Sequence, residues 1–186
     1  MKGNEHMDLS KLNRLDCDEL YVTDKHAFFY GSWASNFYRA PFKWSAYGEE
    51  HEFFCTEQAF MWAKAMTFGD TQTAKDILEE KSSPMACKML GRKVKNYVDS
   101  IWNMLRLGVM YEVNVAKFSQ NEDLRMKITD EKFNGKTFVE ASPSDPIWGI
   151  MMPIGDPNID DETNWKGQNL LGKALTSVRE ELLKGG

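Results

Sequence analysis

Residues 55–66 read CTEQAFMWAKAM and predict the helix around which the rest of the chain is organised. Thr56 is a good N-cap residue, and nothing after it breaks a helix until Gly69. Apolar side chains occur on nearly every side of this segment, which is typical of a helix that lies inside a protein. We therefore expect this helix at the centre of the fold.

Glu57 and Lys64 are the charged residues of this apolar segment. They lie seven residues apart, close to two helical turns, so their side chains project from almost the same face, about 20° apart. A buried ion costs several kcal/mol unless it has a partner, so this pair indicates a functional site. The structural alternative is that Glu57 favours the helix dipole in the first turn and Lys64 extends to the surface.

The length of 186 residues suits one domain with a substantial core. We divide it into an N-terminal arm at residues 1–25 and a domain at residues 26–186. The net charge of -5 argues against a nonspecific nucleic-acid binder, because contacts to phosphates need a basic surface.

Cys17, Cys55 and Cys87 are widely spaced and form no CxxC motif, so neither a zinc module nor a disulfide scaffold is indicated. The polar start has no apolar stretch of the kind found in secretory signals, and no run approaches the length of a membrane span. We expect a cytoplasmic protein with reduced thiols and no membrane partner.

The other elements follow from hydrophobic periodicity and turn residues. We predict a small sheet near the N-terminus, an additional strand later, and several helices after the central one. The predicted strands are residues 27–30, 41–44, 51–55 and 136–141, and the predicted helices are 73–80, 84–91, 98–117 and 167–184. The stripe expected to be buried on the long helix is Val98, Ile101, Trp102, Leu105, Val109, Val113 and Ala116.

A long irregular stretch, residues 142–167, follows the last predicted strand. Loops of this length are usually functional or disordered, and the apolar segment IWGIMMPI favours order. Asp145 precedes a proline here, where a structural turn residue is the alternative to a functional carboxylate. Trp148 and Gly149 suit stacking on a ligand and close backbone approach, although a loop anchored by a buried Trp is an equal alternative.

Several motifs are absent. There is no GxGxxG and no GxxxxGK[ST], so neither a dinucleotide fold nor a P-loop is indicated. Asp156, Asn158 and Asp160 imitate an EF-hand loop, but its sixth position is Asp161 instead of glycine. The three histidines are scattered, so we predict no metal site and no cofactor.

Six segments in order resemble the NADAR family, over about residues 28–183. They are SNFY (35–38), TEQAFMWAKA (56–65), SSPMACKMLGR (82–92), AKF (116–118), FVEASPSDPIWG (138–149) and NWKGQNLLGKALTSVRE (164–180). The resemblance implies an α+β fold, a mostly helical single domain with a small β-sheet. It also implies an N-glycosidase that cleaves the bond between a ribose phosphate and a base-like amine.

The resemblance carries specific roles. The family's catalytic glutamate, lysine, tryptophan and aspartate fall on Glu57, Lys64, Trp102 and Asp145, where core packing is the alternative for Trp102. The substrate-binding residues that we expect are Asn36, Phe37, Arg92, Trp148, Gly149 and Asn169. An ordinary basic turn is the alternative for Arg92, and an ordinary helix start is the alternative for Asn169.

Cleavage of a ribose C1–N bond builds positive charge on the sugar, and the departing nitrogen needs a proton, so carboxylates suit the reaction. We expect Glu57 as the main acid/base group and Asp145 as an orienting or second carboxylate. The family's lysine implies that Lys64 attacks C1 of the opened ribose as a Schiff base, with Trp102 and Trp148 stacked on the substrate.

The substrate stays open between two branches. One is a small riboflavin-pathway intermediate, and the other is ADP-ribosylated guanine, free or in nucleic acid. The segment WGIMMPIGDPNIDD departs from the family's usual WGIG at the expected specificity loop. A non-catalytic sensor of ADP-ribose or a related nucleotide is the alternative function, and there Glu57→Gln would leave ligand affinity intact.

Overall fold

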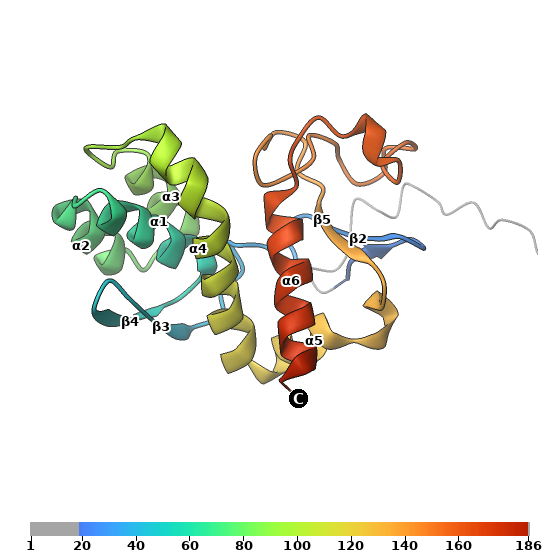
Figure 1. Ribbon diagram of the computed structural model, residues 1–186, viewed down its shortest axis with the longest axis horizontal. Helices are drawn as coiled ribbons and strands as arrows, with labels where there is room; N and C mark the ends of the chain where they lie inside the picture. The colour runs from blue at the N-terminus through green and yellow to red at the C-terminus, as the bar shows by residue number, and fades with distance from the viewer. Residues whose placement is uncertain (1–18, 186) are drawn as a thin grey trace, which may run out of the picture.

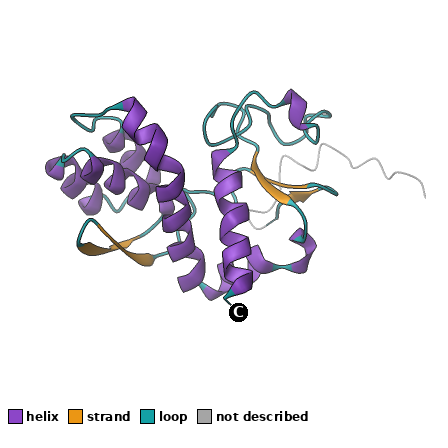
Figure 2. Cartoon of the chain, in the orientation of Figure 1, coloured by secondary structure: helices purple, strands orange, loops and turns teal. Residues whose placement is uncertain are grey.

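The computed structural model describes residues 19–185 and contains six α-helices and five β-strands in that range (Figures 1 and 2). The α+β class predicted from the sequence is confirmed. Most of the predicted N-terminal arm lies outside the described residues. Its residues Tyr21–Val22 form strand β1, which pairs with β2.

The strands are β1 (Tyr21–Val22), β2 (His26–Phe29), β3 (Phe42–Ala46), β4 (Glu49–Phe53) and β5 (Thr137–Glu140). The helices are α1 (Thr56–Thr67), α2 (Thr71–Glu79), α3 (Pro84–Gly91), α4 (Asp99–Gln120), α5 (Glu122–Thr129) and α6 (Leu170–Lys184). Two 3-10 turns, Glu131–Phe133 and Glu162–Asn164, complete the described elements.

The strands form two sheets instead of the single small N-terminal sheet that the sequence suggested. β3 and β4 make an antiparallel hairpin, turned by Tyr47 and Gly48 in the left-handed region. The other sheet has the order β1-β2-β5, and β2 runs parallel to β5 with Phe29 opposite Glu140. Sequence patterns could not reveal this parallel pairing, because it joins segments more than a hundred residues apart.

Both faces of the β1-β2-β5 sheet are buried. Side chains alternate along each strand, so neighbouring residues pack on opposite faces. Phe29 and Phe138 point into a core shared with α4 and α6, which lie side by side in Figure 1. Phe28 and Val139 point the other way, against Ile150 and Ile159 of the long segment between β5 and α6. That segment is therefore ordered because it covers one face of the sheet, although it is almost entirely loop (Figure 2).

Helix α1 is buried along most of its length, as predicted. It packs against α2, α3, α4 and strand β4. The N-cap prediction was off by one position, because Cys55 keeps an extended backbone and Thr56 is already helical. The Thr56 hydroxyl donates to Oδ1 of Asn114 instead of capping the helix.

Helix α4 continues through Gly108 without a break, but the predicted buried stripe is wrong over its first half. Val98, Ile101 and Leu105 are exposed, and the buried residues are Trp102, Met110, Val113, Asn114, Lys117 and Phe118. The packing of α4 between α1 and α6 selects this face. It tolerates polar groups because they find partners, as Lys117 does in the carbonyl oxygens of Trp33 and Ser35, each at 3.1 Å.

Two of the shorter helices, α2 and α3, start at capping side chains. Ser83 accepts a hydrogen bond from the Ala86 N–H and precedes Pro84, as predicted for α3. Asp70 caps α2 by accepting from Thr73. No helix within the described residues, α4 included, is long and apolar enough to cross a membrane.

Candidate active site

A cleft of about 750 Å³ lies at the meeting point of α1, α3, α4 and the segment that follows β5. Charged and aromatic side chains dominate its wall. Those used below are Phe37, Phe60, Lys64, Lys88, Arg92, Tyr97, Trp102, Arg106, Glu140, Asp145 and Trp148.

Glu57 lies in the first turn of α1 and is 5% exposed. Its main-chain N–H donates to the carbonyl oxygen of Asn36 at 3.0 Å, and its Oε1 has no hydrogen-bond partner among the described residues. Burial raises the pKa of Glu57 to about 7 against the opposing charge of Lys88, and Asp145 raises it further. A carboxyl group in this range can both give and take a proton near neutral pH.

Glu140, the last residue of β5, contributes a second carboxyl group to the cleft wall. Burial and the charge of Asp145 raise the pKa of Glu140 to about 7. The sequence analysis missed this residue, because in FVEA it reads as an ordinary polar position of a strand. The pairing of β5 with β2 places Glu140 opposite Phe29 at the cleft, where the charges of Asp145 and Glu57 act on it.

Asp145 forms the structural turn and also places its carboxylate on the cleft wall, while its functional role stays a prediction. Its Oδ1 accepts the N–H groups of Ile147 and Trp148 at 3.0 and 2.8 Å, which is the structural turn. Its Oδ2 lies 4.0 Å from the Nζ of Lys88 on the cleft wall. The turn therefore fixes the carboxylate that faces the cleft.

Lys64 lines the cleft but makes no ion pair with Glu57 among the residues that the structure covers. Its Nζ donates to the carbonyl oxygen of Gly91 at 2.9 Å and lies 4.3 Å from the ring centroid of Tyr97. Burial and the nearby Arg92 lower the pKa of Lys64, while Glu57 raises it less. The shift favours the neutral amine, which is the nucleophilic form.

Aromatic rings form a continuous surface at the cleft. Trp102 and Trp148 both pack on Phe60, with centroid distances of 5.0 and 5.1 Å. Trp102 belongs to the core cluster as well, so its packing role and its place on the wall coexist. Such a surface suits a flat base or a sugar ring.

The structure places the predicted site residues in three groups relative to the cleft. Six line the cleft: Phe37, Lys64, Arg92, Trp102, Asp145 and Trp148. Glu57 and Asn36 are buried, and each has one oxygen without a partner among the described residues. The structure adds Glu140, Lys88 and Arg106, which the sequence analysis did not single out.

Gly149 and Asn169 lie behind the wall. The Asn169 amide group accepts from the Glu140 N–H and donates to the Phe138 carbonyl oxygen, both at 3.0 Å. A Cβ on Gly149 would lie 2.7 Å from the Cβ of Ser142. Both residues hold the end of β5 in place, and their contact with a substrate stays a prediction.

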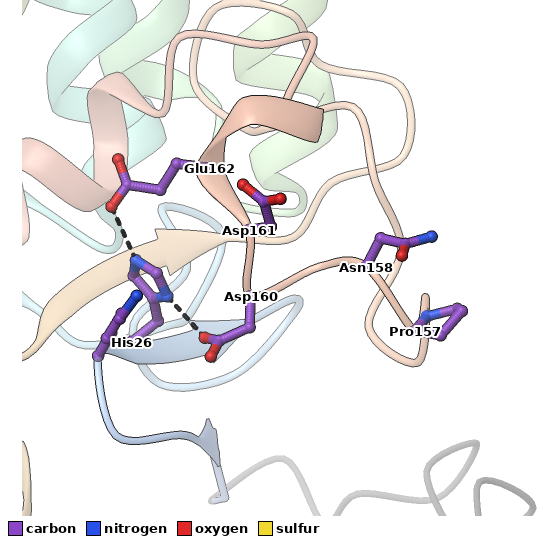
Figure 3. Close-up of a pocket in the computed structure, with 7 residues that line it drawn as sticks. His26, Pro157, Asn158, Asp160, Asp161 and Glu162 are labelled. Carbon is purple, nitrogen blue, oxygen red and sulfur yellow. Dashed lines mark hydrogen bonds and ion pairs between the residues drawn. The ribbon is translucent and has the colours of Figure 1, made fainter.

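A second cavity, of about 470 Å³, lies where the long loop meets β2 (Figure 3). The buried His26 ring stands between two carboxylates there, with Nδ1 2.7 Å from Asp160 and Nε2 3.1 Å from Glu162. Its polar groups already satisfy one another and fasten the loop to the sheet. The larger cleft is therefore the candidate active site, because buried oxygens of Glu57 and Asn36 have no partner within residues 19–185.

Known proteins resemble this chain over most of its length. The model of the NADAR domain matches residues 24–183. N-glycosidase R617 of Acanthamoeba polyphaga mimivirus is 40% identical over 168 residues, which cover 86% of this chain and 97% of that protein. Protein irg-1 of Caenorhabditis elegans is 45% identical over 133 residues, 70% of this chain, and the match spans only 61% of irg-1.

Bacterial relatives agree in fold. N-glycosidase YbiA of Shigella flexneri is 29% identical over 119 residues, or 64% of this chain and 66% of that protein. The NMR structure of the E. coli protein YbiA superimposes with a TM-score of 0.66 at 25% identity, covering 92% of this chain and 95% of that one.

Proposed function

Because the chain belongs to the NADAR domain family, we propose that it is an N-glycosidase whose cleft hydrolyses the bond between a ribose C1 and a base-like nitrogen. The observation that carries this proposal is the buried Glu57 carboxyl beside the cleft, which has a pKa of about 7 and an oxygen with no partner in the described part of the chain. N-glycosidase R617, similar along nearly its whole length, supports the reaction class.

Glu57 is the main acid/base group of the proposed reaction. In its ionised form it takes a proton from water as the water attacks C1, and it stabilises the positive charge that builds on the sugar. Asp145 stays beside Lys88, held by its turn, and orients the substrate. Trp102 and Trp148 stack on the sugar or the base.

Lys64 provides a covalent route on an opened ribose. The neutral amine adds to C1, the base-like amine leaves with a proton, and water then hydrolyses the resulting imine to restore both Lys64 and the free sugar. The lowered pKa of Lys64 supports this route. Borohydride added during turnover should leave a reduced sugar adduct on wild type and none on Lys64→Met, and full turnover without any adduct would exclude the imine.

The substrate carries a phosphate group at the basic part of the cleft. Lys64 and Arg92 are near enough for Arg92 to lower the pKa of Lys64, and Nε of Arg106 has no partner among the described residues. Lys64, Arg92 and Arg106 outnumber the carboxylate of Asp99 on this part of the wall, which favours an anionic ligand, and guanidinium groups bind phosphate well. Both a riboflavin-pathway ribose phosphate and ADP-ribosyl-guanine provide such a group.

The substrate branch is tested by giving purified protein a ribosylaminopyrimidine phosphate and an oligonucleotide with ADP-ribosyl-guanine side by side, with mass spectrometry of the products. Release of the free base from either substrate supports the proposal, and its ratio between the two identifies the branch. Binding of either ligand without release would instead support the nucleotide sensor. Cys55 and Cys87 form no disulfide among the residues that the structure describes, which suits a cytoplasmic location.

A further inference from the structure

The backbone of Glu140 is held rigidly at the rim of the cleft. Its N–H donates to Oδ1 of Asn169, and its carbonyl oxygen accepts from the N–H of Ile150, both at 3.0 Å. The next residue, Ala141, donates to the Phe29 carbonyl oxygen at 2.8 Å, which continues the parallel pairing. Catalytic groups need this kind of support from rigid elements.

The side chain of Glu140, by contrast, is left free for a ligand. It lines the cleft, and within residues 19–185 no side chain or main-chain group forms a hydrogen bond with its carboxyl group. Asp145, Lys88 and Glu57 are the charges that act on it. An acidic side chain with fixed backbone and unpaired oxygens in a cleft is arranged to act on what enters.

We propose that Glu140 is a second catalytic residue of this cleft, which protonates the departing nitrogen while Glu57 takes the proton of the attacking water. The inference rests on the proposed function and extends it to a residue to which the resemblance gave no role. The balance is closed: the C1–N bond breaks, a C1–O bond forms, one proton moves from Glu140 to nitrogen, and one moves from water to Glu57.

The charged groups around Glu57 and Glu140 favour Glu57 as the base and Glu140 as the acid. Three cations, Lys88, Arg92 and Lys64, act on Glu57 against the single carboxylate of Asp145 and favour its ionised form. Two carboxylates, Asp145 and Glu57, act on Glu140 against the single cation Lys88 and favour its protonated form. Two carboxyl groups whose environments push them toward opposite protonation states are the pattern that acid and base pairs use.

Both carboxyl groups can exchange a proton near neutral pH. Burial raises the pKa of both to about 7, and the charge of Glu57 also raises the pKa of Glu140. The catalytic form has Glu57 ionised and Glu140 protonated.

The test compares pH profiles of kcat/KM for wild type, Glu140→Gln, Glu140→Asp and Glu57→Gln, with the exposed β4 variant Glu52→Gln as a matched control. We expect Glu140→Gln to lower the rate about 10²- to 10⁴-fold and to remove the alkaline limb, which reports loss of the acid. Glu57→Gln should remove the acidic limb. Glu140→Asp should keep both limbs at a reduced rate.

Retention of the alkaline limb by Glu140→Gln, or a loss of less than about tenfold, would overturn the role. Thermal unfolding of each variant separates a folding defect from a chemical one, and Glu140→Asp keeps the carboxyl group if the amide disturbs β5. A ¹³C-NMR titration of labelled glutamate side chains needs no substrate. Glu140 titrating at an ordinary carboxyl pKa in an active enzyme would reject this inference alone, whereas wild type without any turnover would reject the proposed function first.

Discussion

The Nζ of Lys88 lies 4.0 Å from Oδ2 of Asp145 and joins helix α3 to the segment after β5 across the cleft. The same ammonium group is the charge that lowers the pKa of Glu57 most, and it also lowers the pKa of Glu140. One lysine thus faces three carboxyl groups. Its charge limits how far burial raises the pKa of Glu57 and Glu140, so removing it tests this effect.

We predict that Lys88→Met shifts the pH profile of kcat/KM to higher pH. Loss of the positive charge raises the pKa of Glu57 and of Glu140, so both groups deprotonate at a pH about one unit higher. Lys75→Met on the exposed face of α2 removes an equal charge far from the cleft and should leave the profile unchanged. A profile of Lys88→Met that stays in place would show that Lys88 does not act on the ionisation of the cleft.

We expect Glu57→Gln to be more stable than wild type at pH 8. The pKa of Glu57 in the folded protein is raised from 4.5 to about 7, so the folded state binds more protons in that window. Its contribution is fully present below about pH 4.5 and is lost as the pH rises through 7. In urea denaturation, the unfolding free energy of the variant minus that of wild type should rise by up to about 3 kcal/mol from pH 4.5 to pH 8. Equal pH dependence in the two proteins would contradict a buried, ionising Glu57.

Lys117 should show the opposite sign in a different window. Burial lowers the pKa of Lys117 from 10.5 to about 7, so the unfolded chain binds more protons between these values and stability rises with pH. The stability of wild type relative to Lys117→Met should therefore increase by about 2 kcal/mol from pH 7 to pH 9. A constant difference would mean that the amine keeps its proton while it donates to Trp33 and Ser35.

Two glycines should respond in opposite ways to alanine. A Cβ at Gly172 would overlap the carbonyl oxygen of Phe138 and the amide group of Asn169, so Gly172→Ala must separate α6 from β5. We expect it to cost about 3 kcal/mol or more. Gly108 lies inside α4 with open space around it, and Gly108→Ala should stabilise by about 0.5–1 kcal/mol. Chemical denaturation measures both, and a similar effect at the two positions would contradict the packing.

Local signals predicted the parts of the fold that local residues decide. The apolar run before Gly69 placed α1, and Ser83 with Pro84 placed the start of α3. Ile101 and Leu105 misled the prediction for α4, because neighbouring helices choose its buried face and that face includes Asn114 and Lys117. Burial of polar residues depends on partners that only the folded chain provides.

The site residues also divide into those that local sequence patterns predicted and those that depend on long-range packing. Family motifs led to Glu57 and Asp145, whose positions follow from a helix start and a turn. Glu140 and Lys88 lie within the family segments, but their local patterns read as an ordinary strand residue and a solvated helix face. Their meeting in the cleft depends on the β2–β5 pairing and on the packing of α3 against α1, which are long-range contacts.

The most direct test of the central claim is turnover by Glu57→Gln compared with Glu52→Gln, both confirmed as folded, on a ribose phosphate or ADP-ribosyl substrate that wild type cleaves. We predict that Glu52→Gln releases free base at the wild-type rate, whereas Glu57→Gln falls by at least about 10²-fold while still binding the substrate. Undiminished release of base by Glu57→Gln would contradict the account, because the buried carboxyl group beside the cleft would then have no part in breaking the N-glycosyl bond.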